Sequence, residues 1–271
     1  FLGTQDSVDM IFNTNATEQM RIMANGQIGV GTSSPSAMMD VAGDFGAMGN
    51  YRLDGDTLIK APGYSNLIIG HNAGGGVGVD SSDENNRNVF IGHYAGMKNI
   101  TGESNVFIGD SAGINSLTGD GNVFVGRRAG WSNITGGGNT FVGGRAGDDN
   151  ITGSQNTFIG LVAGRDNTHG SQNTFIGDGA GVQNETGEQN TYVGENAGFD
   201  AKGSRNVMIG KSVGKFWETG NENIALGNFA AENMEGSRNI ILGYLAVSGD
   251  SLTSAVEENV IIGTFASQNL K

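Results

Sequence analysis

A short phrase, asparagine followed by three mostly apolar residues and a glycine, recurs through most of this sequence. It begins twelve times between Asn66 and Asn259, and six successive steps between its copies are 17 residues long. Catalysis is done once per site, whereas a chain that repeats one phrase at a fixed period builds a stack of similar structural units. The repeat therefore predicts a solenoid.

With the asparagine as position 0, position +4 is glycine in every copy, position +7 is alanine in eleven copies, and position +8 is glycine in the first nine. Three β-branched or aromatic residues closed by glycine favour a short strand and a tight corner, because glycine destabilises a helix by about 1 kcal/mol. We predict an all-β fold, a β-solenoid of about twelve 16–17-residue coils spaced about 4.8 Å apart. The columns that define it include Asn105, Asn122, Asn139, Asn156 and Asn173, with Gly109, Gly126, Gly143, Ala112, Ala129 and Ala146.

Stacked asparagines in register are expected to hydrogen-bond from coil to coil. The strand itself poses a separate problem, because positions +1 and +3 face one side and +2 the other, and all three are apolar. One solenoid has one interior, so the second face is expected to meet another copy of the chain. We assign +1 and +3 to the interior and the +2 aromatic residues to the contact between subunits. These predicted contact residues are Phe90, Phe107, Phe124, Phe141, Phe158 and Phe175.

The composition narrows the class of protein. Glycine accounts for 48 of 271 residues, yet it does not recur every third residue and only two prolines occur, which excludes collagen. A net charge of −13 without a basic cluster argues against nucleic acid as a partner. No apolar run approaches the roughly 18 residues of a membrane-spanning helix, and no signal peptide is recognisable. Because the sequence begins at Phe1, we interpret it as a piece of a longer or processed protein.

Candidate chemistry is sparse. His71 and His93 share position +5 in adjacent copies, followed by Asp110, so stacking would place the two imidazoles about 5 Å apart. Such a set can bind a divalent metal, but an exposed column of mixed residues is the favoured interpretation. Gly75–Asp80 matches only one copy of a calcium-binding repeat, and Gly210–Ser212 lacks the earlier glycine of a phosphate loop. We expect no enzyme activity, no cofactor and no metal.

Other features concern the surface. Aromatic residues outside the repeat strand, and the insertions Gly75–Arg87 and Gly249–Glu258, are the candidates for contacting a glycan. Packing at coil edges or at a subunit seam is the favoured role of the aromatics. Four Asn-x-Thr sequons, which begin at Asn99, Asn133, Asn150 and Asn184, arise from the repeat itself. The aromatic candidates are Trp131, Phe199, Phe216, Trp217 and Tyr244.

The stretch NVFIGDSAGINSLTGDGN, from Asn105 to Asn122, is similar to the left-handed β-roll repeats in the heads of trimeric autotransporter adhesins. Those repeats also have a strand that ends in Ile-Gly, followed by small residues, at a slightly shorter period. Their +2 position usually holds a small residue, where this chain has phenylalanine. The resemblance implies a left-handed parallel β-roll, intertwined or side by side in a homotrimer.

A second resemblance covers Met10 to Gly43, which looks like a module of phage and phage-like tail fibres and of large bacterial surface proteins. Its phrases are Met20-Arg21-Ile22 and Gly29-Val30-Gly31-Thr32 with Pro35. From the residues alone, Asn25-Gly26 predicts a hairpin turn, and Pro35 opens a short helix-compatible stretch to Met39. We therefore expect a hairpin module at 1–43, a transition at 44–64 and the solenoid at 65–271.

These features together predict a shaft segment of an extracellular attachment fibre, located on a virion, a phage-like particle or a bacterial cell surface. Its partners would be further copies of itself in a homotrimer and a receptor on the host or cell surface, possibly a glycan. The resemblance to tail fibres also implies a chaperone or tip beyond Lys271. Three alternatives stay open: a carbohydrate-binding adhesin, an ice-binding solenoid with a threonine column, and a polysaccharide-cleaving tailspike.

Overall fold

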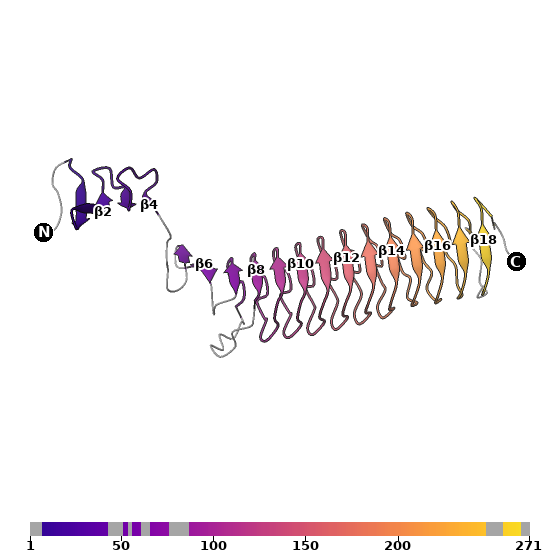
Figure 1. The fold of residues 1–271 in the computed structure, drawn as a ribbon. Helices are drawn as coiled ribbons and strands as arrows, with labels where there is room; N and C mark the ends of the chain where they lie inside the picture. Colours follow the sequence, from indigo (N-terminus) through magenta and orange to yellow (C-terminus); the bar gives the residue numbers. More distant parts are fainter. Residues whose placement is uncertain are drawn as a thin grey trace. The chain divides into compact units, whose positions relative to one another are not determined.

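The computed structural model describes residues 7–42, 51–53, 56–60, 66–75, 87–247 and 257–266. The chain divides into two compact units, Phe1–Gly49 and Asn50–Lys271 (Figure 1). All regular structure in the described residues is β-strand, and these residues contain no helix. The all-β prediction is therefore confirmed.

The first unit is a four-stranded sheet in the order β1-β2-β3-β4. The predicted turn at Asn25-Gly26 joins two antiparallel strands, and Gly26 has a φ of 87°. Arg21 of the Met-Arg-Ile phrase lies within 2.9 Å of Asp9 and 2.6 Å of Glu18. The helix-compatible stretch from Pro35 to Met39 forms no helix, and Met39 begins a strand parallel to β3. The strands are β1 (Met10–Thr14), β2 (Thr17–Ile22), β3 (Ile28–Val30) and β4 (Met39–Val41).

The second unit is one 14-stranded sheet that runs from β5 to β18 in chain order. Its last twelve strands are parallel and in register, one per coil, and they follow one another along the unit in Figure 1. The predicted β-solenoid with a period of about 17 residues is therefore confirmed. The twelve strands are β7 (Leu67–Ile69), β8 (Val89–Ile91), β9 (Val106–Ile108), β10 (Val123–Val125), β11 (Thr140–Val142), β12 (Thr157–Ile159), β13 (Thr174–Ile176), β14 (Thr191–Val193), β15 (Val207–Ile209), β16 (Ile224–Leu226), β17 (Ile240–Leu242) and β18 (Val260–Ile262).

Two antiparallel strands precede the parallel stack. β5 (Tyr51–Leu53) pairs with β6 (Asp56–Lys60), and β6 pairs with β7. The segment 44–64, expected as a transition, thus contributes two strands to the same sheet. An antiparallel strand laid along β7 uses the hydrogen-bonding groups of that edge, which protects it from pairing with another chain.

The strand-ending glycines make the corner that each coil needs. Gly109, Gly126 and Gly143 have φ values of 137°, 138° and 141°, a region that L-residues with a side chain rarely adopt. The alanines three positions further on, Ala112, Ala129 and Ala146, are fully buried. Glycine and alanine therefore bring the chain back close to its own strand.

The assignment of strand faces made from the sequence is wrong. All six phenylalanines at position +2 have 0% exposure within the single chain, so they fill the interior of the solenoid and cannot contact another subunit. From Phe107 to Tyr192 their rings stack with centroids 4.8–4.9 Å apart and planes within 8° of parallel. That separation equals the spacing between strands, so the backbone ladder sets the ring spacing. Positions +1 and +3 face outward instead.

The asparagine column at position 0 links each coil to the next. The side-chain Nδ2 of Asn105 donates to the carbonyl oxygen of Gly119 in its own coil at 2.8 Å, and its Oδ1 accepts from the backbone N–H of Asn122 at 2.9 Å. The same pair of bonds recurs at Asn122, Asn139, Asn156 and Asn173. These side chains are fully buried, so the predicted hydrogen-bonded ladder is confirmed.

A second asparagine column, at position +11, was not expected. Nδ2 of Asn150 donates to Oδ1 of Asn133 at 2.8 Å, and Nδ2 of Asn167 donates to Oδ1 of Asn150 at 2.8 Å. Both columns converge on the same carbonyl oxygens; Gly153, for example, accepts from Asn139 and Asn150. The sequon asparagines belong to this second column, and their exposure is 0–1%, which excludes them as glycosylation acceptors in the folded chain.

Candidate functional site

The outward positions of the parallel sheet form one long apolar surface, here called the outer stripe: positions +1 and +3 of β7 to β18. Every residue of the stripe is half-buried or exposed, whereas +2 is buried in the first eleven of these strands. The stripe holds only Val, Ile, Leu and four Thr, with no charged residue. A continuous apolar face of this kind marks an interaction surface more often than a solvated one.

Charged side chains border the stripe, and several are paired with the neighbouring coil. On one side, Arg205 lies 3.0 Å from Glu222. On the other, Lys211 lies 2.9 Å from Glu195. An apolar centre with a polar rim is the usual anatomy of a protein interface.

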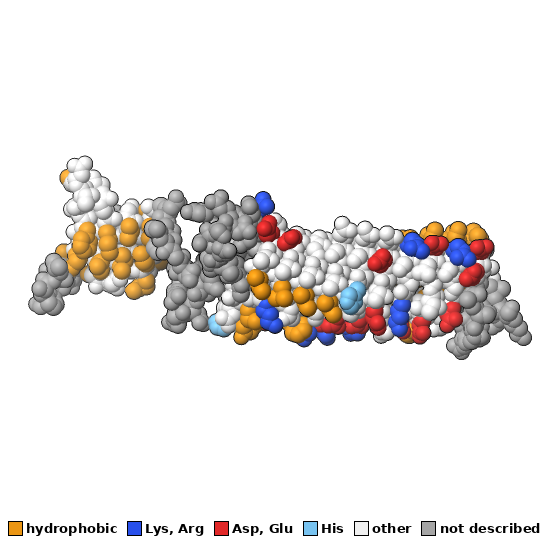
Figure 2. Space-filling model, turned by 90° about the horizontal axis from the view of Figure 1, so that it is seen from below, with side chains coloured by type: hydrophobic (Ala, Val, Ile, Leu, Met, Phe, Trp, Pro, Cys, Tyr) orange, Lys and Arg blue, Asp and Glu red, His pale blue; other side chains and the backbone are white. Residues whose placement is uncertain are grey.

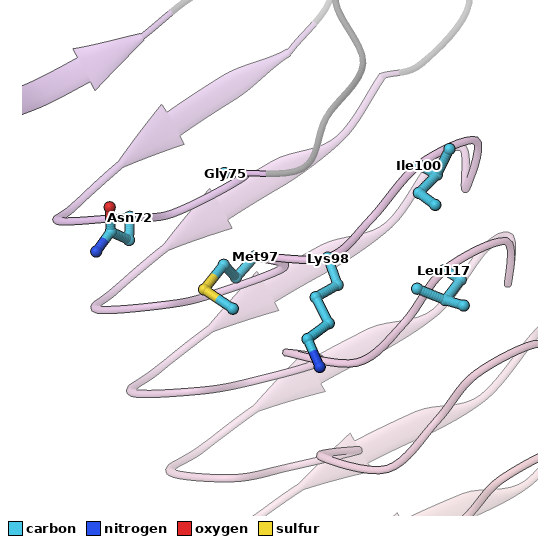
Figure 3. A pocket seen from close by; sticks show the side chains of 6 residues that line it. All are labelled: Asn72, Gly75, Met97, Lys98, Ile100 and Leu117. Carbon is cyan, nitrogen blue, oxygen red and sulfur yellow. The ribbon is translucent and has the colours of Figure 1, made fainter.

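A shallow apolar groove lies elsewhere on the first coils of the solenoid. Its larger part, about 640 Å³, is lined by Met97, Lys98, Ile100 and Leu117 together with Asn72 and Gly75 (Figure 3). A smaller part of about 410 Å³ shares Lys98 and Leu117 and continues past Ile134 and Ile151. Apolar side chains also gather on the N-terminal part of the solenoid in Figure 2, with charged side chains of both signs nearby.

The structure brings the predicted histidine pair together. The rings of His71 and His93 are stacked with centroids 5.4 Å apart, and Nδ1 of His93 lies 3.6 Å from Oδ2 of Asp110. The Ser111 hydroxyl, with a smaller contribution from His93, lowers the pKa of the Asp110 carboxyl. Within the described residues, no group of three or more His, Cys, Asp or Glu side chains is arranged to hold a metal ion.

A charged network spans three neighbouring coils. The fully buried carboxylate of Asp148 lies 3.2 Å from Arg128 and 2.9 Å from Arg145, so it bridges two coils. Arg165 pairs with Asp166 at 2.7 Å. Burial raises the pKa of the Asp149 carboxyl, and the neighbouring carboxylates of Asp148 and Asp166 raise it further. Asp148 is thus well compensated, whereas Asp149 is not.

Substitutions of these two neighbouring aspartates should therefore have opposite effects on the stability of the folded chain. Asp149→Asn is expected to raise the free energy of unfolding at pH 7, by less than about 1 kcal/mol because the site is partly solvated. Since the folded pKa of Asp149 is raised, its ionised form costs stability above that pKa, and the cost disappears as acidification protonates it. Denaturation of parent and variant between pH 7 and pH 3 should therefore converge at low pH.

Asp148→Asn is the matched control. It should lower stability at pH 7, because Arg128 and Arg145 lose their shared carboxylate. If Asp149→Asn instead destabilised the chain, or left a pH-independent difference from the parent, the assignment of uncompensated charge to Asp149 would be wrong.

The aromatic candidates for glycan contact have different surroundings. Trp217 is buried at 1% exposure and belongs to the interior. The guanidinium of Arg128 lies 4.7 Å from the centroid of the Trp131 ring. Phe199 and Phe216 meet edge to face with centroids 6.2 Å apart. Tyr244 meets Phe229 and Phe265 edge to face, with centroids 6.3 and 5.7 Å apart. These contacts fit packing at coil edges, although the rings of Phe216 and Tyr244 stay partly exposed.

Several other predicted features have ordinary places in the repeat or lie outside the described residues. Gly210 has a φ of 138° and is the strand-ending glycine of its coil, so no phosphate loop forms there. The two insertions fall mostly within 76–86 and 248–256, outside the described residues.

No helix long and apolar enough to span a membrane occurs in the part of the chain that the structure describes. Comparison of the chain with protein-family models, curated proteins and solved structures found no match. The two resemblances noted from the sequence remain expectations.

Proposed function

We propose that this chain is the shaft segment of an attachment fibre and that its role is to hold a binding tip at a fixed distance from a particle or cell. The observation that carries the proposal is that some positions of the repeat are nearly constant from copy to copy, whereas others vary. Positions 0, +3, +4 and +7 barely change from copy to copy, whereas the corner positions +5, +6, +9 and +10 vary freely. A lateral binding surface built from these corners would need repeated residues there as well.

The contacts along the solenoid support a stiff spacer. Backbone bonds of 2.8 Å join successive strands, as from the N–H of Val123 to the carbonyl oxygen of Asn139. The asparagine columns add buried bonds between the same coils. Bending would have to break several of these bonds at once, and each unsatisfied buried group costs about 1–3 kcal/mol. These backbone and asparagine hydrogen bonds therefore form a continuous ladder that resists bending of the solenoid.

The proposal includes a homotrimer, an extracellular or virion location and a surface receptor. Support comes from the resemblance of the coils to adhesin heads and of Met10 to Gly43 to a tail-fibre module. The apolar outer stripe supports self-association independently of these resemblances. On this proposal the chain is not an enzyme and its function needs no cofactor.

Deleting three whole coils tests the spacer role. Removal of residues 122–172 joins Gly121 to Asn173 and keeps every column in register. We expect a fibre that is shorter by roughly 14 Å, at about 4.8 Å per coil, with assembly and attachment intact. Electron microscopy gives the length, and a binding assay on native target cells gives attachment.

A deletion that ends at Gly164 is the control, because it removes a half-integral number of coils and joins unlike columns. It should fail to fold. If the in-register deletion gave a correctly assembled, shortened fibre that no longer attached, the removed coils would carry recognition and the chain would not be a spacer.

Ice binding is a second candidate, favoured by one observation. The threonines of β11 to β14 project outward in register on the outer stripe, beside outward valine or isoleucine. The threonine column covers only four coils, which is short for an ice-binding plane. Freezing-point measurements on the parent chain separate the two functions, since a shaft should show no thermal hysteresis. The four residues are Thr140, Thr157, Thr174 and Thr191.

A further inference from the structure

We propose that the outer stripe is the seam along which copies of this chain assemble side by side, parallel and in register. The inference rests on the proposed shaft function, which it deepens by naming the partner as a second copy and by locating the contact. It also replaces the contact expected from the sequence, since the phenylalanines lie in the interior.

The burial pattern gives the first argument. Large aliphatic side chains of the stripe stay exposed in the single chain, among them Ile159 at 39%, Ile176 at 37% and Ile209 at 44%. They continue without a charge across twelve strands. The chain has a net charge of −13, yet its carboxylates lie at the borders of the stripe or elsewhere, several of them paired with Lys or Arg. The stripe itself therefore brings no like charges opposite each other when copies meet.

The geometry indicates what fits the stripe. Its strands are already paired on both sides from β7 to β17, so a partner cannot add a strand there and has to pack against the side chains. These side chains form ridges that repeat with the strand spacing of about 4.8 Å. A partner that interdigitates over the whole length needs the same period on its own surface. A second copy of this stripe has that period.

The contact area is sufficient for a specific assembly. Eleven steps of about 4.8 Å give a stripe roughly 50 Å long, and a three-residue strand with its side chains is about 10 Å wide. Each copy thus offers on the order of 500 Å², and a pair buries about 1,000 Å², near the lower limit for a specific interface. In a trimer each stripe meets two others around the axis.

Parallel alignment of the copies follows from the proposed shaft function, because copies that all run from the particle to the tip must point the same way.

The apolar groove is the competing surface for contact between copies. Its aliphatic column covers only four coils, Ile100, Leu117, Ile134 and Ile151, and then becomes Thr168 and Glu185. Lys98 also lines it. The groove is therefore shorter and less apolar than the stripe.

Charge placed on the stripe tests the seam. In the full chain, the double variant Ile159→Lys with Ile176→Lys should convert the oligomer to a monomer in sedimentation experiments, with an unchanged circular dichroism spectrum. The matched control is Ile134→Lys with Leu161→Lys. Ile134 has the same 37% exposure as Ile176 but lies off the stripe, as does Leu161. The control should stay oligomeric; dissociation of the control alone would overturn the proposal.

Single cysteines test the alignment, because the native chain has none. Thr157→Cys lies near the middle of the stripe and Val207→Cys lies toward its C-terminal end. Parallel copies in register place each cysteine at the same height as its counterpart, across packed sheets about 10 Å apart. A short bismaleimide can span that separation, so it should link the chains of both variants. Cross-linking of Thr157→Cys alone would show that the copies pair antiparallel. Cross-linking of neither variant would show that the copies do not meet along the outer stripe. Each result contradicts the proposal.

Failure of the seam and failure of the shaft give different results. If the parent chain is monomeric but has the expected length and holds its tip at the expected distance, only the proposed contact along the outer stripe would be wrong. If both cysteine variants cross-link, but the chain loses attachment when whole coils are deleted, only the spacer role would be overturned.

Discussion

Phe141→Asp should prevent the middle of the solenoid from folding. Phe141 has 0% exposure and stacks between Phe124 and Phe158 with ring centroids 4.9 and 4.8 Å away. Loss of a buried phenylalanine costs about 3–5 kcal/mol, and an unpaired carboxylate in the same space adds a large desolvation cost. We expect the free energy of unfolding, measured by urea denaturation, to fall by more than about 5 kcal/mol.

Thr140→Asp, on the adjacent residue of the same strand, is the control. Thr140 faces outward and is half-buried, so this chain should fold with a loss of about 1 kcal/mol or less. On the face assignment made from the sequence, Phe124→Asp with Phe141→Asp would have impaired assembly alone. The buried phenylalanine column changes that expectation to loss of the fold itself. A folded monomer carrying Phe141→Asp would restore the original assignment.

The sequence predicts the strands, their register and the asparagine ladder because each repeats as a column of one residue type. The face assignment fails because positions +1, +2 and +3 are all apolar. The strand therefore shows no alternation of apolar and polar residues that would indicate which face is buried. A usable indication lies at position +8. A Cβ on Gly147 would overlap the ring of Phe141, so the glycine makes room for the phenylalanine inside the coil. The glycine is replaced by Ala231 and Val247 in copies whose +2 residues are Ala225 and Ile241, which are smaller than phenylalanine.

The candidate surfaces were harder to predict than the fold. The column at +11 was visible only as sequons, and its role depends on the carbonyl oxygens of corner glycines such as Gly153, which no sequence pattern displays. The column then changes to Ala201, Trp217 and Met234, which are buried. The outer stripe cannot be recognised from the sequence, because most of its residues are as apolar as the buried phenylalanines between them. Which surface faces water is decided by tertiary packing, whereas the repeat fixes only which residues are equivalent.

Gly143→Ala should produce a loss nearly as large as that of a core substitution. The φ of Gly143 is 141°, a region essentially restricted to glycine, and strain there costs about 1–3 kcal/mol. The added Cβ would also overlap the carbonyl oxygen of Gly160 in the next coil. Relief of that overlap has to separate two coils and weaken the bond from the N–H of Gly160 to the carbonyl oxygen of Val142, now 2.8 Å. We expect a loss of about 3 kcal/mol or more in urea denaturation.

Gly138→Gln tests whether this loss comes from the particular corner and not from any replaced glycine. Gly138 also has a positive φ, 68°, but the nearest atom to an added Cβ is Cγ of Gln155 at 3.7 Å. The next coils already carry glutamine in this column, and Nε2 of Gln172 donates to Oε1 of Gln155 at 3.1 Å. The variant extends that ladder by one rung, which offsets the cost of a left-handed backbone, so stability should change by no more than about 1 kcal/mol. Equal losses in Gly138→Gln and Gly143→Ala would mean that backbone strain alone, and not the close approach of successive coils, governs the corner.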